Sequence, residues 1–250
     1  MSTATVERAA GGRRRDSIPA VAAACDLMES DWSPWHMVLH GVTWRDYVRM
    51  MDARTAAGRD RLRITFDRGT AELHSPGHDS ELGGESVSIG NRHERWKKMI
   101  ARLIEAAAMG FRLPVVACGN LTLDRADLDR GLEPDECYYV QNAARVRSVR
   151  ELDFATDPPP DLFVEIEVSR TVIDRLELCA ALGIPEVWRF DGTTLRFFLL
   201  EGTTFIESKT SLAFPALTSD TLGGLLARIG GEDDTTLCNE IFEWARGTGS

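Results

Sequence analysis

Three acidic residues in this chain interrupt apolar stretches. Glu165 and Glu167 are two residues apart in an otherwise apolar run, and Asp135 opens an earlier one. In a strand, side chains at i and i+2 project to the same face, about 7 Å apart. Burying several carboxylates together is unfavourable unless a cation or a proton neutralises them. The pattern therefore predicts a metal site, and metals held by acids are typical of phosphate chemistry.

The donor atoms available suit a hard divalent cation. Two carboxylates of the cluster Asp135, Glu165 and Glu167, with a backbone carbonyl such as that of Ile166, would bind Mg²⁺ or Mn²⁺, with water completing the octahedron. Such an ion polarises a phosphate oxygen and makes a bound water more acidic. The alternative is a solvent-facing strand side that carries ordinary acids. The apolar residues around the acids favour the metal site, because they indicate a central strand.

A strand–helix–strand unit positions these acids. Residues 162–168 alternate, so Glu165 and Glu167 share the face opposite the aliphatic side chains. The helical pattern over 171–182 ends at a glycine, and 187–190 begins another strand. This spacing predicts a βαβ crossover and hence a parallel pair.

The other segments predict helices and short strands around this unit. We expect a mixed α/β sheet flanked by helices, with an N-terminal hairpin and C-terminal helices. Residues 1–38 form a partly flexible tail in this interpretation, 39–212 the main domain and 213–250 a helical extension of it. The expected elements are a helix over 43–54 capped by Thr43, hairpin strands over 61–67 and 70–74, a long loop over 77–91, a helix over 92–109 stopped by Gly110, strands over 114–123 and 135–140, a meander up to 207, and helices over 219–229 and 236–246.

Composition limits the functional classes. The 250 residues are 43% hydrophobic and 27% charged, and the formal net charge is −10. This charge argues against binding nucleic acid through overall electrostatics, but it leaves room for an enzyme with a local basic surface. No apolar run approaches the roughly 20 residues of a membrane span, so we expect no membrane partner. The five cysteines lack paired spacing, which predicts no disulfide framework or zinc site and favours the cytoplasm.

Four segments together carry a family resemblance, namely 65–76, 131–139, 160–169 and 181–189. They resemble the Uma family of restriction endonucleases, which belongs to the PD-(D/E)XK nuclease superfamily. The resemblance runs from about residue 41 to 210, in family order. It implies a restriction-endonuclease-like core and a Mg²⁺-dependent endonuclease that hydrolyses phosphodiester bonds in DNA.

The resemblance assigns roles to residues near the acids. Asp135 takes the place of the first metal-binding acid, and Glu165 that of the second. Glu167 stands where the superfamily has a lysine, and Arg175 stands where many Uma-like sequences place that lysine on the next helix. Arginine stays charged and cannot act as a general base, but it can stabilise charge that develops on a phosphoryl group.

Two more residues match the family. His93 corresponds to a histidine at the head of the first core helix, and its alternative role is to cap an apolar stripe. Glu72 corresponds to an acid in the hairpin, which either completes the metal site or is a solvated acid.

The missing lysine leaves a second function open, namely an impaired nuclease fold that binds DNA or a protein without cutting. If the protein cuts both strands of a duplex, one active site per chain favours a homodimer.

Overall fold

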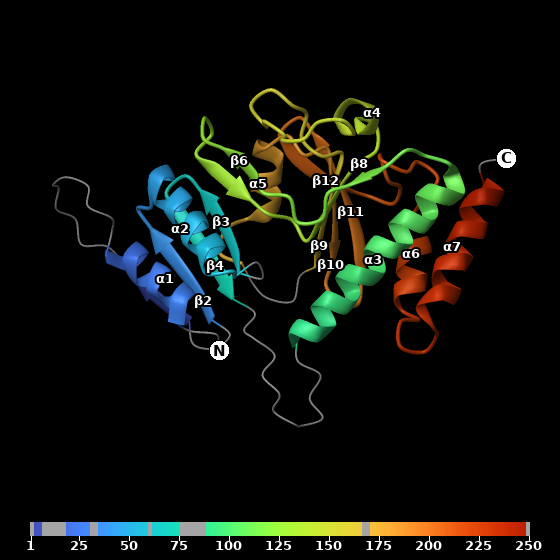
Figure 1. Cartoon of the computed structure of the whole chain (residues 1–250). Coiled ribbons are helices and arrows are strands. Elements are labelled where there is room, and N and C mark those ends of the chain that lie inside the picture. The colour runs from blue at the N-terminus through green and yellow to red at the C-terminus, as the bar shows by residue number, and fades with distance from the viewer. Residues whose placement is uncertain are drawn as a thin grey trace. The chain divides into compact units, whose positions relative to one another are not determined.

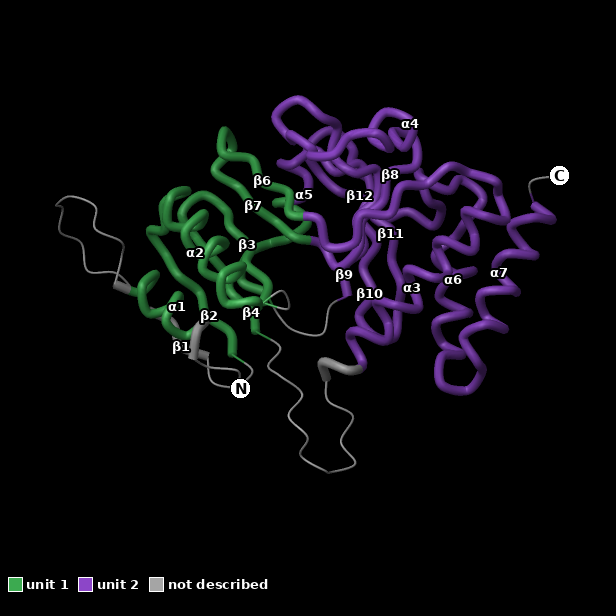
Figure 2. Tube along the Cα trace, in the orientation of Figure 1, with its two compact units in different colours: residues 1–86, 122–133, 171–178 green, residues 87–121, 134–170, 179–250 purple. Residues whose placement is uncertain are grey.

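The computed structural model describes residues 3–6, 19–30, 35–59, 62–75, 89–166 and 171–248. These residues form two six-stranded sheets with flanking helices (Figure 1). The predicted mixed α/β class is confirmed, although the strands divide between two sheets instead of one. Two compact units result, unit 1 from residues 1–86, 122–133 and 171–178, and unit 2 from residues 87–121, 134–170 and 179–250 (Figure 2).

Unit 1 contains the predicted hairpin. Ile64 lies opposite Leu73 and Phe66 opposite Ala71, and these four side chains are buried in one core with the apolar faces of two helices. The opposite face carries polar side chains, as the alternation predicts. The elements, with the strands in sheet order, are β1 (Thr3–Val6), β2 (Trp35–His40), β4 (Thr70–Ser75), β3 (Arg63–Asp67), β7 (Arg130–Leu132) and β6 (Leu123–Arg125), with helices α1 (Pro19–Ser30) and α2 (Trp44–Ala56).

The start of α2 follows from its sequence. The Thr43 hydroxyl accepts a hydrogen bond from the Asp46 N–H, and the Asp46 carboxylate accepts one from the Thr43 N–H. This reciprocal capping box confirms the predicted cap. One turn further, the Tyr47 hydroxyl donates to Asp124 at 2.6 Å. A side chain on Gly131 would collide with that hydroxyl, so β7 needs glycine there.

Unit 2 contains the predicted βαβ crossover, since β9 and β10 are parallel. One face of its sheet is apolar and forms a core with side chains from α3, α6 and α7. The predicted meander and C-terminal helices are also present. The elements, with the strands in sheet order, are β12 (Thr204–Ser208), β11 (Leu195–Glu201), β10 (Glu186–Phe190), β9 (Leu162–Ile166), β8 (Glu136–Tyr139) and β5 (Val116–Ala117), with α3 (Ile89–Phe111), α4 (Ala143–Val146), α6 (Ser219–Leu226) and α7 (Asp234–Thr248); α5 (Arg175–Ala181) begins in unit 1 and ends in unit 2.

Two predicted helix starts are wrong. Helix α3 begins at Ile89, inside the predicted loop over 77–91, and α5 begins at Arg175, four residues after the predicted start at 171.

Two further predicted boundaries, both near glycines, are also wrong. Helix α3 continues through Gly110 to Phe111, and Arg112 has the positive φ, 57°, that ends it. Gly110 instead allows close packing, because a Cβ there would lie 2.7 Å from Ala245 on α7. The single strand over 114–123 is two short ones, β5 in the sheet of unit 2 and β6 in that of unit 1, separated by a bend where Gly119 has a φ of 60°.

Some expectations concern residues that lie outside those described. Glu167 is one of them, as are most of the predicted loop over 77–91 and much of the predicted N-terminal tail. The proposed boundaries at residues 38 and 212 stay a prediction. Within the described ranges, no helix has the length and apolar character required to cross a membrane.

Candidate active site

In unit 2, Asp135 directly precedes strand β8, and Glu165 lies in the neighbouring strand β9. Strand β8 pairs antiparallel with β9, with Glu136 opposite Val164, and continuing this register by one residue brings Asp135 opposite Glu165. The Asp135 carboxylate accepts a hydrogen bond of 2.8 Å from the N–H of Ile166, the residue after Glu165. The two acids are only 7% and 6% exposed. The fold therefore brings together Asp135 and Glu165, two of the three residues that the family resemblance assigned to the metal.

Two arginines continue this row across the sheet. Arg189 of β10 is the register partner of Glu165, and Arg196 of β11 is the register partner of Arg189. Register partners project to the same face of a sheet. Burial lowers the pKa of Arg189, and the negative charge of Glu165 opposes this shift. One face of four adjacent strands thus carries two acids followed by two arginines, which we call the acid–arginine row (Asp135, Glu165, Arg189, Arg196).

His93, near the start of α3, contacts the first acid of the row. Its Nε2 lies 3.2 Å from Oδ2 of Asp135. Burial alone lowers the pKa of His93, but the hydrogen bonds and negative charges of Asp135 and Glu94 outweigh burial and raise the pKa to about 9. His93 is therefore protonated at neutral pH and donates to Asp135.

Cationic side chains lie beside both proposed metal-binding acids. Asp135 has protonated His93 beside it, and Glu165 has Arg189 as its neighbour, so the burial of the acids does not by itself require a metal ion. In the part of the chain that the structure describes, no three His, Cys, Asp or Glu side chains are grouped to hold a metal. Two carboxylates still fit Mg²⁺, which takes one or two of them and keeps several waters.

Glu72, the third predicted metal ligand, lies in unit 1 and is buried there. Its carboxylate accepts hydrogen bonds from the N–H groups of Val172, at 2.9 and 3.0 Å, and Ile173, at 3.0 Å. His36 Nε2 lies 2.7 Å from the same carboxylate. These contacts hold the segment that leads into α5.

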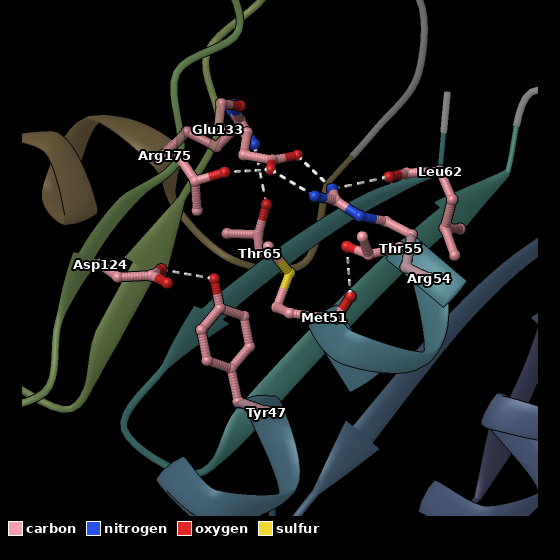
Figure 3. Close-up of polar contacts among 10 residues, drawn as sticks. Tyr47, Met51, Arg54, Thr55, Leu62, Thr65, Asp124, Glu133 and Arg175 are labelled. Carbon is pink, nitrogen blue, oxygen red and sulfur yellow. Dashed lines mark hydrogen bonds and ion pairs between the residues drawn. The ribbon is translucent and has the colours of Figure 1, made fainter. Parts of the chain in front are cut away.

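Arg175 also lies in unit 1. Its two terminal nitrogens donate to the Thr65 hydroxyl and to the Glu133 carbonyl oxygen, both at 2.9 Å. The Glu133 carboxylate is in turn paired with Arg54, at 2.5 and 2.8 Å, which reaches it from α2 (Figure 3). Of the predicted site residues, unit 2 therefore holds His93, Asp135 and Glu165, and unit 1 holds Glu72 and Arg175.

The two arginines of the row were not among the site residues predicted from the sequence. Arg189 could have been found by the same feature that identified Glu165, because both are charged residues inside an apolar strand. Asp161 likewise had no role predicted from the sequence. Its carboxylate accepts hydrogen bonds from the N–H groups of Val140, at 2.7 Å, and Asn142, at 2.9 Å, and so fixes the turn after β8.

Comparisons with protein families and with solved structures found similar proteins. Residues 72–225, more than half of the chain, match the Uma2 family, described as "Putative restriction endonuclease". The crystal structure of a "putative nuclease belonging to DUF820" from Anabaena variabilis ATCC 29413 is similar at 18% identity and a TM-score of 0.38, over 54% of this chain and 82% of that one. No curated protein matches the sequence. The matched region contains the whole acid–arginine row, and the chain belongs to the Uma2 family of nuclease-like proteins.

Proposed function

We propose that this protein is a metal-dependent endonuclease that hydrolyses phosphodiester bonds in DNA. Membership of the Uma2 family supports the nuclease class. The observation that carries the proposal is the acid–arginine row, in which Asp135 and Glu165 are buried on neighbouring strands and a permanent positive charge follows them. Oxygen donors beside an arginine suit a phosphate substrate.

Each residue of the site has a distinct role in this proposal. Asp135 and Glu165 hold Mg²⁺ or Mn²⁺, and His93 orients Asp135 through its hydrogen bond. A divalent cation bound there supplies Lewis-acid stabilisation to a phosphate oxygen and makes water more acidic. Arg189 places a positive charge beside the acids, where it attracts the phosphate backbone of the substrate. Because arginine keeps its proton, neither Arg189 nor Arg175 acts as the general base.

Covalently closed plasmid DNA tests this function, because only an internal cut relaxes it. We expect the purified protein to convert supercoiled plasmid into nicked or linear DNA with Mg²⁺ or Mn²⁺, and to leave it intact with EDTA. A single-stranded DNA circle and a single-stranded RNA circle, incubated in parallel, define the substrate. Absence of relaxation with every metal, or equal relaxation with EDTA, would contradict the proposal.

One observation favours a second function, a nuclease fold that binds DNA without cutting it. Arg175, which stands at the place of the family's lysine, donates to Thr65 and to the backbone of Glu133. These contacts give it a structural role within unit 1. This alternative predicts that labelled duplex DNA is bound in Mg²⁺ and recovered uncut after prolonged incubation.

A further inference from the structure

A pocket of about 110 Å³ lies next to the proposed metal-binding acids. It is lined by Arg189 of β10, Arg196 and Phe198 of β11, and Asp191 of the turn between the two strands. Arg189 is the register partner of Glu165, so the pocket opens on the face of the sheet that carries the acids. All of these residues belong to unit 2.

Asp191 shapes the wall of this pocket. Its Oδ1 accepts hydrogen bonds from the N–H groups of Thr193, at 2.9 Å, and Thr194, at 2.7 Å. Its other oxygen, Oδ2, accepts a hydrogen bond of 3.3 Å from Arg196. The Asp191 carboxylate therefore closes the hairpin turn and holds the Arg196 side chain against it.

Phe198 packs against Arg189, the other arginine of the pocket. The guanidinium carbon of Arg189 lies 5.9 Å from the centre of the Phe198 ring. A guanidinium packed over an aromatic face donates hydrogen bonds from its edge, in the fork geometry that matches phosphate oxygens. The pocket thus combines two arginines, each positioned by a different neighbour.

The pocket carries a net positive charge, in contrast to the chain as a whole. Two arginines and one aspartate line it, whereas the chain as a whole has a net charge of −10. A chain with this net charge needs a local basic site to hold a polyanion. Neighbouring strands lie about 4.8 Å apart, so Arg189 is one strand spacing from Glu165 and Arg196 is two.

We propose that the pocket formed by Arg189, Arg196, Phe198 and Asp191 binds a phosphate that flanks the scissile phosphate on the same nucleic-acid strand. This inference rests on the proposed nuclease function and gives that site a second, metal-independent contact with its substrate. The pocket holds the strand in place while the acids act on the neighbouring phosphate.

Salt-dependent binding of DNA tests the proposal without any turnover. The probe is a short fluorescein-labelled duplex, and fluorescence anisotropy in EDTA is recorded at several NaCl concentrations. We expect Arg196→Gln to weaken binding roughly tenfold at low salt and to reduce the slope of log Kobs against log[NaCl] by about 1, as for one lost phosphate contact. Arg189→Gln combined with Arg196→Gln weakens binding further, and Arg196→Lys keeps the wild-type slope.

Arg246→Gln is the matched control. It removes the same charge from α7, on the other face of the sheet, where Arg246 is 59% exposed. The proposal is overturned if Arg196→Gln binds like the wild type, or if Arg246→Gln lowers the slope equally. Thermal unfolding checks that each variant folds. If Arg189→Gln is unstable, the single variant Arg196→Gln, whose wild-type side chain is exposed, decides the test.

The binding result and the nuclease result are separable. A protein that nicks plasmid but whose Arg196→Gln variant binds normally refutes the pocket and keeps the nuclease. A protein that never nicks, but whose salt slope depends on Arg196, refutes the nuclease and keeps the phosphate pocket.

Discussion

Buried acids in this protein serve different purposes, and their hydrogen-bond partners distinguish them. Glu72 and Asp161 accept hydrogen bonds from backbone N–H groups of segments distant in sequence, so they fix loops. Asp135 accepts from the Ile166 N–H and from His93, and Glu165 is paired in register with Arg189. Asp135 and Glu165 are also register neighbours in one sheet, whereas Glu72 and Asp161 each hold a loop, so Asp135 and Glu165 are the better candidates for phosphate chemistry.

Replacing Glu72 tests its structural role. Glu72→Ala leaves the N–H groups of Val172 and Ile173 without their acceptor, and the Ile173 group is buried, where an unsatisfied donor costs about 1–3 kcal/mol. We expect the free energy of unfolding, measured in urea, to fall by that order, and Glu72→Gln, which keeps one acceptor oxygen, to lose less. Unchanged stability of Glu72→Ala, together with loss of Mn²⁺ binding, would instead make Glu72 a metal ligand.

At the scale of single residues, the sequence could predict which acids share a strand face but not what they contact. Alternation in 162–166 places Glu165 opposite the core side chains, as the structure confirms. The partners of Glu72 are 100 and 101 residues away, and His93 is 42 residues from Asp135. Such contacts depend on tertiary packing, which periodicity does not encode.

At the scale of elements, the packing of α3 against α7 depends on Gly110. The two helices run side by side (Figure 1). A methyl group at position 110 would collide with the Phe242 carbonyl oxygen and crowd Ala245. We expect Gly110→Ala to destabilise unit 2 by about 1–3 kcal/mol, as overpacking does. Thermal unfolding followed by circular dichroism measures this loss.

Gly224 provides the control for this prediction. It lies inside α6, and a Cβ added there meets no atom within 4 Å among the residues described. Gly224→Ala should therefore stabilise the protein by up to about 1 kcal/mol through helix propensity. If both alanine variants shift stability in the same direction, the packing role of Gly110 is wrong.

The sequence pattern predicts the helices and strands that depend on local features, but not the boundaries that depend on tertiary packing. The hairpin of β3 and β4 and the crossover from β9 to β10 were predictable, because alternating side chains and turn residues are local features. The end of α3 was not, because a glycine that permits close helix packing resembles one that stops a helix. The separate sheet of unit 1 was missed, since β6 and β7 come from residues 123–132 and join strands from the first 75 residues.

At the scale of the whole molecule, metal binding should stabilise the fold. A ligand that binds only the folded state adds about 2.7 kcal/mol when its concentration is 100 times its Kd. We expect saturating Mn²⁺ to raise the thermal midpoint of the wild type, EDTA to reverse the rise, and Asp135→Asn to show a much smaller response. An equal rise in Asp135→Asn would mean that the metal binds elsewhere.

The net charge of the chain and the local charges of the row have opposite effects on nucleic-acid binding. A net charge of −10 opposes nucleic-acid binding, whereas the row places Arg189 and Arg196 beside Asp135 and Glu165. A divalent cation at the acids would add positive charge to the same face. Substrate affinity should therefore depend on both the metal and the arginines.

The rate of plasmid nicking by Glu165→Gln, compared with the wild type at saturating Mn²⁺, tests the central claim most directly. Glutamine keeps the size of the side chain and removes the charge that would bind the metal. We predict a loss of roughly 100-fold or more, with the thermal midpoint in EDTA close to that of the wild type. A folded Glu165→Gln protein that nicks at the wild-type rate would contradict the account.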